Sequence, residues 1–254
     1  MEVIMKIRES VEHKLKELKL NGALTQLIKQ ESDIACSEWP FLERLEHILD
    51  NQVIENDNKR ISLLRRQAKL RWPGARVSDT RYDIQTGLKE SVTQQLIQFN
   101  WVKDCRHLII TGKTGCGKTR YGCAIANEAI NQKVSVGFYR FSELIALLVM
   151  ADDAGELVKV RNKLKRFKLL FIDDWGVSPL NVEQRHLLFE LIEFRDQKGS
   201  LIITSQYPVG GWYDAFGDET IADSTLDRIV HSAHKINMKG ESFRKLMGIQ
   251  GGLK

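Results

Sequence analysis

The residues with the clearest chemical meaning form one run, Gly112-Lys113-Thr114-Gly115-Cys116-Gly117-Lys118-Thr119. This run fits the phosphate-loop pattern G-x-x-x-x-G-K-S/T, with an apolar segment before it and a helix-like segment after it. Glycines let such a loop wrap closely, so that its backbone N–H groups and the N-terminus of the next helix face an anion. We expect Lys118 to neutralise the β- and γ-phosphates of a nucleotide and the Thr119 hydroxyl to ligate Mg²⁺.

Two acids follow a second apolar run: Leu169 to Ile172 lead directly into Asp173 and Asp174. In a parallel sheet the residues at the carboxyl end of a strand lie at the edge that binds the ligand. We expect Asp173 to hold Mg²⁺ and Asp174 to orient the attacking water, since phosphoryl transfer depends mainly on positioning and charge.

A third apolar run, SLIITSQ, ends in Thr204, Ser205 and Gln206. In a P-loop ATPase this strand lies beside the acidic one, so a polar side chain here can contact the water or the γ-phosphate. Further along, Arg228 lies on a predicted helix. Either it is a surface arginine paired with Asp227, or it reaches into a neighbouring subunit's site in an oligomeric ATPase.

Basic residues are concentrated in two stretches, although the net charge is only +5. Residues 1–58 hold 7 basic and 12 acidic side chains, whereas residues 59–76 hold 7 basic and none acidic. A solvated surface explains either stretch alone, but two of them in one nucleotide-binding chain favour nucleic acid, which rewards clustered positive charge through counterion release. The predicted DNA-binding residues are Lys59, Arg60, Arg65, Arg66, Lys69, Arg71 and Arg76, and then Lys159, Arg161, Lys163, Lys165 and Arg166.

Several other classes of protein are excluded. Asn162-Lys163 lacks the acid of the guanine motif N-K-x-D, and the chain has no L-S-G-G-Q motif of transporter ATPases. No apolar run approaches the roughly 20 residues of a membrane-spanning helix, and the N-terminus does not resemble a signal peptide. We therefore expect a soluble cytoplasmic protein without a membrane partner.

The pattern of apolar residues predicts two domains. Apolar residues at three- and four-residue steps indicate an all-α domain over residues 1–74, with helices around residues 4–18, 24–28, 40–49 and 54–64. Asn21-Gly22 is expected to separate the first two helices, and Trp72-Pro73-Gly74 to end the last. Residues 75–254 alternate apolar runs with helix-length segments, which indicates an α/β fold with a parallel sheet covered on both faces. The predicted strands are residues 107–111, 134–140, 168–173, 200–205 and 234–239.

These motifs, taken in order, resemble those of the IstB family, AAA+ ATPases that assist transposition of bacterial insertion sequences and are related to DnaC and DnaA. The resemblance covers nearly the whole chain. Beyond the phosphate loop it rests on LKELKLNGAL (15–24), LLFIDDWG (169–176), IITSQYPVGGWYDAF (202–216), LDRIVHSAH (226–234) and KGESFRK (239–245). It implies a P-loop AAA+ ATPase core after a small helical domain.

The resemblance also implies roles for single residues. Arg228 matches the family's arginine finger, Arg244 matches an arginine near the nucleotide, and Gln206 stands at the sensor position, where Asn is usual. The predicted nucleotide-binding residues are thus Gly112, Lys113, Thr114, Gly115, Cys116, Gly117, Lys118, Thr119, Arg120 and Arg244. The predicted catalytic residues are Lys118, Asp173, Asp174, Gln206 and Arg228.

By the same resemblance we expect a Mg²⁺-dependent ATPase that forms a homo-oligomer on double-stranded DNA, with ATP at the subunit interfaces, and that recruits and stimulates a transposase. Because Asp174 is one methylene shorter than the usual glutamate, hydrolysis is expected to be slow. A DnaC-like helicase loader, a nucleotide-gated scaffold and a small-molecule phosphotransferase are the alternatives.

Overall fold

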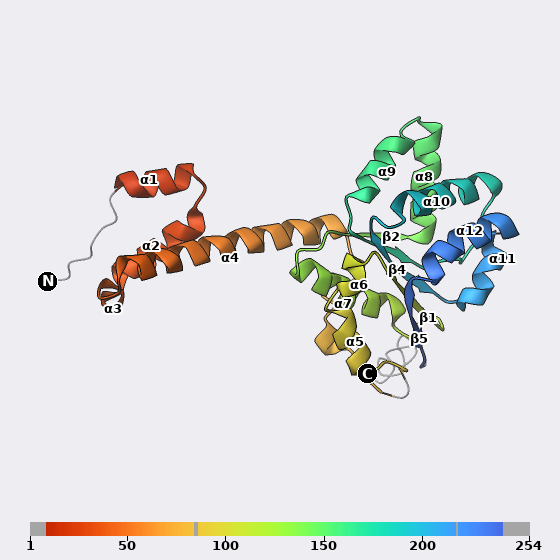
Figure 1. Ribbon diagram of the computed structural model, residues 1–254, viewed down its shortest axis with the longest axis horizontal. Helices are drawn as coiled ribbons and strands as arrows, with labels where there is room; N and C mark the ends of the chain where they lie inside the picture. The colour runs from red at the N-terminus through yellow and green to blue at the C-terminus, as the bar shows by residue number, and fades with distance from the viewer. Residues whose placement is uncertain (1–8, 84–85, 217, 241–254) are drawn as a thin grey trace, which may run out of the picture. The chain divides into compact units, whose positions relative to one another are not determined.

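The computed structural model describes residues 9–83, 86–216 and 218–240. They fall into two compact units, within residues 1–63 and 64–254 (Figure 1). The first is helical and the second is built around a five-stranded parallel sheet. The two units are separated by how densely their residues contact one another. The predicted domain boundary after residue 74 stays a prediction. No helix within the described ranges is both long and apolar enough to span a membrane.

The first unit contains α1 (Glu9–Glu17), α2 (Asn21–Ser32), α3 (Ile34–Ser37) and most of α4 (Phe41–Ala68). The prediction of two helices around residues 40–49 and 54–64 is wrong, because α4 is continuous. No glycine or proline lies between Leu49 and Ile54, so nothing interrupts the helix there. The helix also ends before the predicted Trp72-Pro73-Gly74, because Lys69 takes a left-handed conformation with φ 52°.

Asn21-Gly22 was predicted to separate the first two helices, and in the structure these two residues are the first two of α2. The absence of a side chain at Gly22 lets α2 approach α4 closely: a Cβ there would lie 2.8 Å from the Asn51 carbonyl oxygen. Asn51 Nδ2 donates to the Gly22 carbonyl at 2.7 Å, and the buried Gln52 accepts from the Ala23 N–H at 3.0 Å. The glycine therefore serves packing between the two helices.

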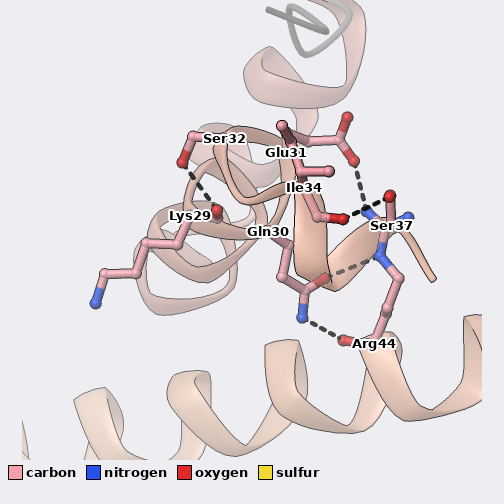
Figure 2. A network of polar contacts seen from close by, with 7 residues as sticks. All are labelled: Lys29, Gln30, Glu31, Ser32, Ile34, Ser37 and Arg44. Atoms are coloured by element: carbon pink, nitrogen blue, oxygen red, sulfur yellow. Dashed lines mark hydrogen bonds and ion pairs between the residues drawn. The ribbon is translucent and has the colours of Figure 1, made fainter. Parts of the chain in front are cut away.

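A second polar contact joins the other end of α2 to α4 (Figure 2). The buried Gln30 amide donates to the Arg44 carbonyl at 2.9 Å and accepts from Arg44 Nε at 3.3 Å. Arg44 also forms an ion pair with Glu31 at 2.6 Å. Because α2 buries few apolar residues, these polar contacts help to fix its position on α4.

The second unit contains one sheet whose strands are all parallel, in the order β2-β3-β4-β1-β5. The strands are β1 (His107–Gly112), β2 (Val136–Arg140), β3 (Leu169–Asp173), β4 (Ser200–Ser205) and β5 (Ala233–Met238). All five predicted strands are confirmed. The acidic strand β3 lies between β2 and β4, so the polar end of β4 is adjacent to Asp173.

Helices cover both faces of this sheet (Figure 1). α7 packs against β1, β3 and β4 on one face, and α8, α10 and α12 belong to the apolar core on the other. The α-helices of the unit are α5 (Glu90–Leu96), α6 (Asn100–Lys103), α7 (Lys118–Asn131), α8 (Phe141–Asp153), α9 (Leu157–Lys165), α10 (Val182–Arg195), α11 (Trp212–Phe216) and α12 (Glu219–Val230); the 3₁₀ helices are η1 (Val77–Asp79) and η2 (Val209–Gly211). The predicted α/β fold with a parallel sheet is confirmed.

An aromatic cluster fixes the chain directly after the acid pair. Trp175 is completely buried, and its ring centroid lies 4.8 Å from that of Phe141 and 5.5 Å from that of Trp212. The backbone N–H of Trp175 also donates to the Thr204 carbonyl at 2.8 Å. Burial of these large rings anchors the turn between β3 and α10 and with it the position of the two aspartates.

Candidate nucleotide site

The phosphate loop connects β1 to α7 and needs glycine at its fixed positions. Gly117 precedes α7 with φ 96°, a conformation that side chains disfavour. At Gly112 a Cβ would lie 2.3 Å from the Met238 carbonyl oxygen, so no other residue fits without displacing β5. Lys118 is 5 % exposed, and its ammonium donates to the carbonyls of Gly112 at 2.7 Å and Lys113 at 2.9 Å. The loop is thus closed around its own lysine, beside the N-terminus of α7.

Asp173 lies at the carboxyl end of β3 and is completely buried. Its Oδ1 accepts hydrogen bonds from the hydroxyls of Thr204 on β4 and Thr119 on α7, the latter at 2.8 Å. Burial raises the pKa of the Asp173 carboxyl, and these two hydrogen bonds act in the opposite direction. The structure therefore joins the two predicted magnesium ligands, Thr119 and Asp173, directly.

The other carboxylate oxygen tests whether Mg²⁺ fits here. Asp173 Oδ2 is buried and has no hydrogen-bond partner, and its nearest ion-pair contact is Arg71 Nη1 at 3.7 Å. A buried carboxylate oxygen with spare acceptor capacity beside a threonine hydroxyl is a donor set that suits Mg²⁺. These residues fit the metal, which when bound would neutralise phosphate charge.

Asp174 follows with a left-handed backbone, φ 59°. Its N–H donates to Thr204 Oγ1 at 3.1 Å, so one threonine contacts both consecutive aspartates. Sequence reasoning named Thr204 only as a possible contact for water or phosphate. Its hydroxyl instead orients Asp173 and supports the strained residue after it.

Gln206 makes contact with the phosphate loop itself. Its Oε1 accepts a 2.5 Å hydrogen bond from Thr114 Oγ1, and both residues are exposed. This contact links the end of β4 to the loop across the edge of the sheet. The longer side chain of Gln, compared with the usual Asn, therefore reaches the loop.

Arg228 lies apart from these contacts, on α12. Its guanidinium donates to the Ser224 carbonyl at 2.5 Å, lies 3.5 Å from a Glu193 carboxylate oxygen and stacks 5.5 Å from the centroid of the Phe189 ring. Its side chain keeps 30 % exposure. Among the described residues, no hydrogen bond or ion pair connects Arg228 with the phosphate loop or Asp173 of the same chain. It lines an open polar cavity with Tyr213, Asp227 and His231.

Two further predicted nucleotide contacts have different outcomes. Arg120, on the first turn of α7, is exposed and forms a 3.8 Å ion pair with Asp79. Arg244 lies outside the described residues.

The first basic stretch divides between the two units. Lys59 and Arg60 lie on α4 in the first unit, where Lys59 pairs with Glu55. In the second unit, Arg65 donates to Asn131 at 2.6 Å, and the side chains of Arg66, Lys69 and Arg76 are exposed. Arg71 differs from the others, because it contacts the candidate magnesium site.

The second basic stretch lies on and just after α9. Lys159, Lys163, Lys165 and Arg166 are exposed, whereas Arg161 pairs with Glu190 on α10 and is only 21 % exposed. Most of this stretch is therefore available to a charged partner, and Arg161 has a structural contact as well.

Comparison with known proteins decides the family. The model of the IstB-like ATP binding proteins matches residues 13–250. The chain belongs to this family. It is 35 % identical over 237 residues to y4pL of Sinorhizobium fredii, named as an insertion sequence ATP-binding protein, covering 91 % of this chain and 94 % of that one. It is 34 % identical over 194 residues to the protein named as the IS1162 ATP-binding protein of Pseudomonas fluorescens, covering 76 % and 84 %.

Solved structures show that this IstB-like chain shares the fold of AAA+ proteins. The DnaC helicase loader matches with a TM-score of 0.56 at 19 % identity, over 66 % of this chain and 99 % of that one. AMPPCP-bound DnaA from Aquifex aeolicus matches with a TM-score of 0.53 at 16 % identity, over 70 % and 55 %. The predicted AAA+ core and family are thus confirmed.

Proposed function

We propose that the chain is a Mg²⁺-dependent ATPase that assembles on duplex DNA when it binds ATP and that recruits and stimulates the transposase of its insertion sequence. The observation that carries the proposal is the hydrogen bond between Thr119 and Asp173, which unites the phosphate loop and the acidic strand in one site. The relatives named as insertion sequence ATP-binding proteins supply the biological setting.

The ATPase part of the proposal assigns each residue one task. The phosphate loop cradles the phosphates and Lys118 turns its ammonium from the loop carbonyls to them. Thr119 and Asp173 hold Mg²⁺, and Asp174 orients the attacking water. Because Asp174 is shorter than a glutamate and its backbone is held by Thr204, we expect turnover below the ~10 per second that is typical of enzymes.

Arg228 is proposed to act on a neighbouring subunit. Glu193 and Phe189 hold the guanidinium on α12, where it keeps 30 % exposure and has no contact with its own loop among the described hydrogen bonds and ion pairs. A positioned, partly exposed arginine suits the stabilisation of transition-state charge in trans. ATP between subunits would then make assembly depend on the nucleotide.

Both basic stretches are proposed to follow DNA phosphates. The exposed side chains of Lys163, Lys165 and Arg166 gather within one turn of the chain at the end of α9, and Arg65 and Arg66 lie near the end of α4. Contacts of this type neutralise the backbone without reading bases, so binding is expected to depend strongly on salt.

A helicase loader is the second candidate, because the DnaC helicase loader shares the fold over almost its whole chain. It predicts a preference for single-stranded DNA and a replicative helicase as partner. Preference for duplex and co-purification with a transposase distinguish the first proposal from it.

Nucleotide binding tests the site directly. Lys118→Ala is expected to weaken binding of a fluorescent ATP analogue in Mg²⁺ and to abolish ATP-dependent assembly. Lys103→Ala is the control, because Lys103 is an exposed lysine of the second unit that lies outside the phosphate loop. Equal binding by the two variants would contradict the proposed site.

A mixing experiment tests the role of Arg228. Arg228→Ala and Lys118→Ala subunits are each expected to lack hydrolysis when assayed alone. In a mixture, a Lys118→Ala subunit can supply Arg228 to an intact phosphate loop, so part of the activity returns. A mixture as inactive as its components would argue against action in trans.

A further inference from the structure

Arg71 lies at the candidate magnesium site although it comes from the segment that follows α4. Its Nη1 is 3.7 Å from Asp173 Oδ2. The Asp173 side chain is fully buried, whereas that of Arg71 keeps 30 % exposure. In the described part of the chain, Arg71 is the one basic residue that forms an ion pair with this carboxylate.

The backbone around Arg71 is held against the helix that follows the phosphate loop. The Asn127 side-chain amide of α7 donates to the carbonyls of Trp72 at 3.4 Å, Pro73 at 3.2 Å and Ala75 at 2.9 Å. Leu70 is also buried. The turn is therefore anchored, and the guanidinium reaches Asp173 from a fixed backbone.

The contact uses the same carboxylate oxygen that is open to a metal. Oδ1 already accepts from the hydroxyls of Thr119 and Thr204, so Oδ2 is the remaining acceptor of Asp173. A guanidinium and a divalent cation that approach one oxygen repel each other, and this repulsion is strong at a buried group. The two cations therefore exclude each other at Oδ2.

We propose that Arg71 competes with Mg²⁺ for Asp173, so that loading of the metal displaces the guanidinium and links the nucleotide site to the segment that leads out of α4. This inference rests on the proposed Mg²⁺–nucleotide site. It assigns to Arg71, one of the predicted DNA-binding residues, a regulatory task at the phosphate loop.

A magnesium titration tests the competition. Mg²⁺ is added to the full chain with a fluorescent, non-hydrolysable ATP analogue, and the Mg²⁺ concentration at half-maximal binding is measured. Arg71→Ala removes the competing cation, so this concentration is expected to fall by about threefold, the factor that corresponds to a partly exposed ion pair. Arg81→Ala, which removes an exposed arginine outside the predicted nucleotide- and DNA-binding sets, is expected to match the wild type.

Thermal unfolding distinguishes competition from a purely structural role of Arg71. In EDTA without nucleotide, Arg71→Ala leaves the Asp173 carboxylate without its ion pair and is expected to unfold at a lower temperature than the wild type. With saturating Mg²⁺ and analogue the difference is expected to disappear. A purely structural role would lower the unfolding temperature under both conditions and would overturn the inference.

The titration has two further outcomes that would overturn it. An unchanged or higher half-maximal Mg²⁺ concentration for Arg71→Ala would show that Arg71 does not compete. Weaker binding of the analogue at saturating Mg²⁺ would make Arg71 a phosphate ligand. If the wild-type chain itself binds no analogue at any Mg²⁺ concentration, the proposed nucleotide site fails, and the inference fails with it.

Discussion

Replacement of Thr204 by valine tests the internal support of the acid pair. Valine has nearly the shape of threonine but cannot donate to Asp173 Oδ1 or accept from the Asp174 N–H at 3.1 Å. A buried hydrogen bond to a charged group contributes about 1.5–3 kcal/mol, and an amide N–H left without a partner costs about 1–3 kcal/mol. Since Asp173 can relieve part of the loss by taking up a proton, we expect a total of about 2–4 kcal/mol.

The assay is thermal unfolding of the metal-free chain, followed by tryptophan fluorescence. For a unit of this size 1 kcal/mol corresponds to about 2–4 °C, so Thr204→Val is expected to lower the midpoint by about 4–16 °C. Thr204→Ser is the matched control, because it keeps the hydroxyl and loses only a methyl group, at a cost of about 1 kcal/mol. If Thr204→Val is as stable as Thr204→Ser, the hydroxyl does not support the acid pair and the reasoning is refuted.

Three further predictions follow from other parts of the structure. Burial lowers the pKa of His107 from 6.5 to about 4, and its Nδ1 accepts from the Leu201 N–H. The unfolded chain therefore takes up a proton on this histidine at a higher pH than the folded chain does, so the free energy of unfolding should fall by about 3 kcal/mol as the pH drops from about 6.5 to about 4. Urea titrations at both pH values should show that His107→Gln removes this loss. Arg195 is 3 % exposed and donates to the carbonyls of Leu164, Phe167 and Ser200. Arg195→Met should therefore lower the free energy of unfolding by about 3 kcal/mol in urea denaturation. An unchanged midpoint would show that these hydrogen bonds contribute little. Charge reversal of Lys163 and Arg166 should weaken binding to any duplex and flatten its salt dependence; a wild-type salt slope would make this stretch an ordinary solvated surface.

The five strands of the second unit could be predicted from local patterns, whereas α5, α6 and α11 were not predicted. The central strands β1, β3 and β4 are short apolar runs that are buried over most or all of their length, whereas the edge strand β5 keeps His234, Lys235 and Asn237 exposed. A strand that helices cover on both faces must be apolar throughout, so a short apolar run in this pattern is hard to assign to any other element. The order of the strands was expected only by analogy with P-loop ATPases.

The first unit was harder to predict because its patterns are weaker. α4 exposes Phe41, Leu42 and Leu49, so apolar spacing there does not mark a core. The contact of Gly22 with α4 depends on a residue 29 positions away, Asn51, and Asn-Gly alone is typical of a turn. This is why a packing glycine was taken for a helix breaker.

In the candidate site, sequence spacing predicted which residues to consider but not the contacts between them. The phosphate-loop pattern contains Lys118 and Thr119, and strand polarity placed Asp173 beside them. The roles of Thr204 and Arg71 depend on side chains that meet across the sheet edge, and their positions in the sequence carry no periodic signal. For Thr204 the sequence offered one indication: it is a polar residue at the end of the strand that lies beside the acidic strand β3.

The central claim is ATP-dependent assembly on duplex DNA, and sedimentation of the purified chain tests it most directly. The chain is centrifuged with a duplex of mixed sequence or the matching single strand, in ATP, ADP or no nucleotide. We predict large complexes on the duplex that require ATP and that Lys118→Ala does not form. Complexes that form equally without nucleotide, or only on the single strand, would contradict the claim.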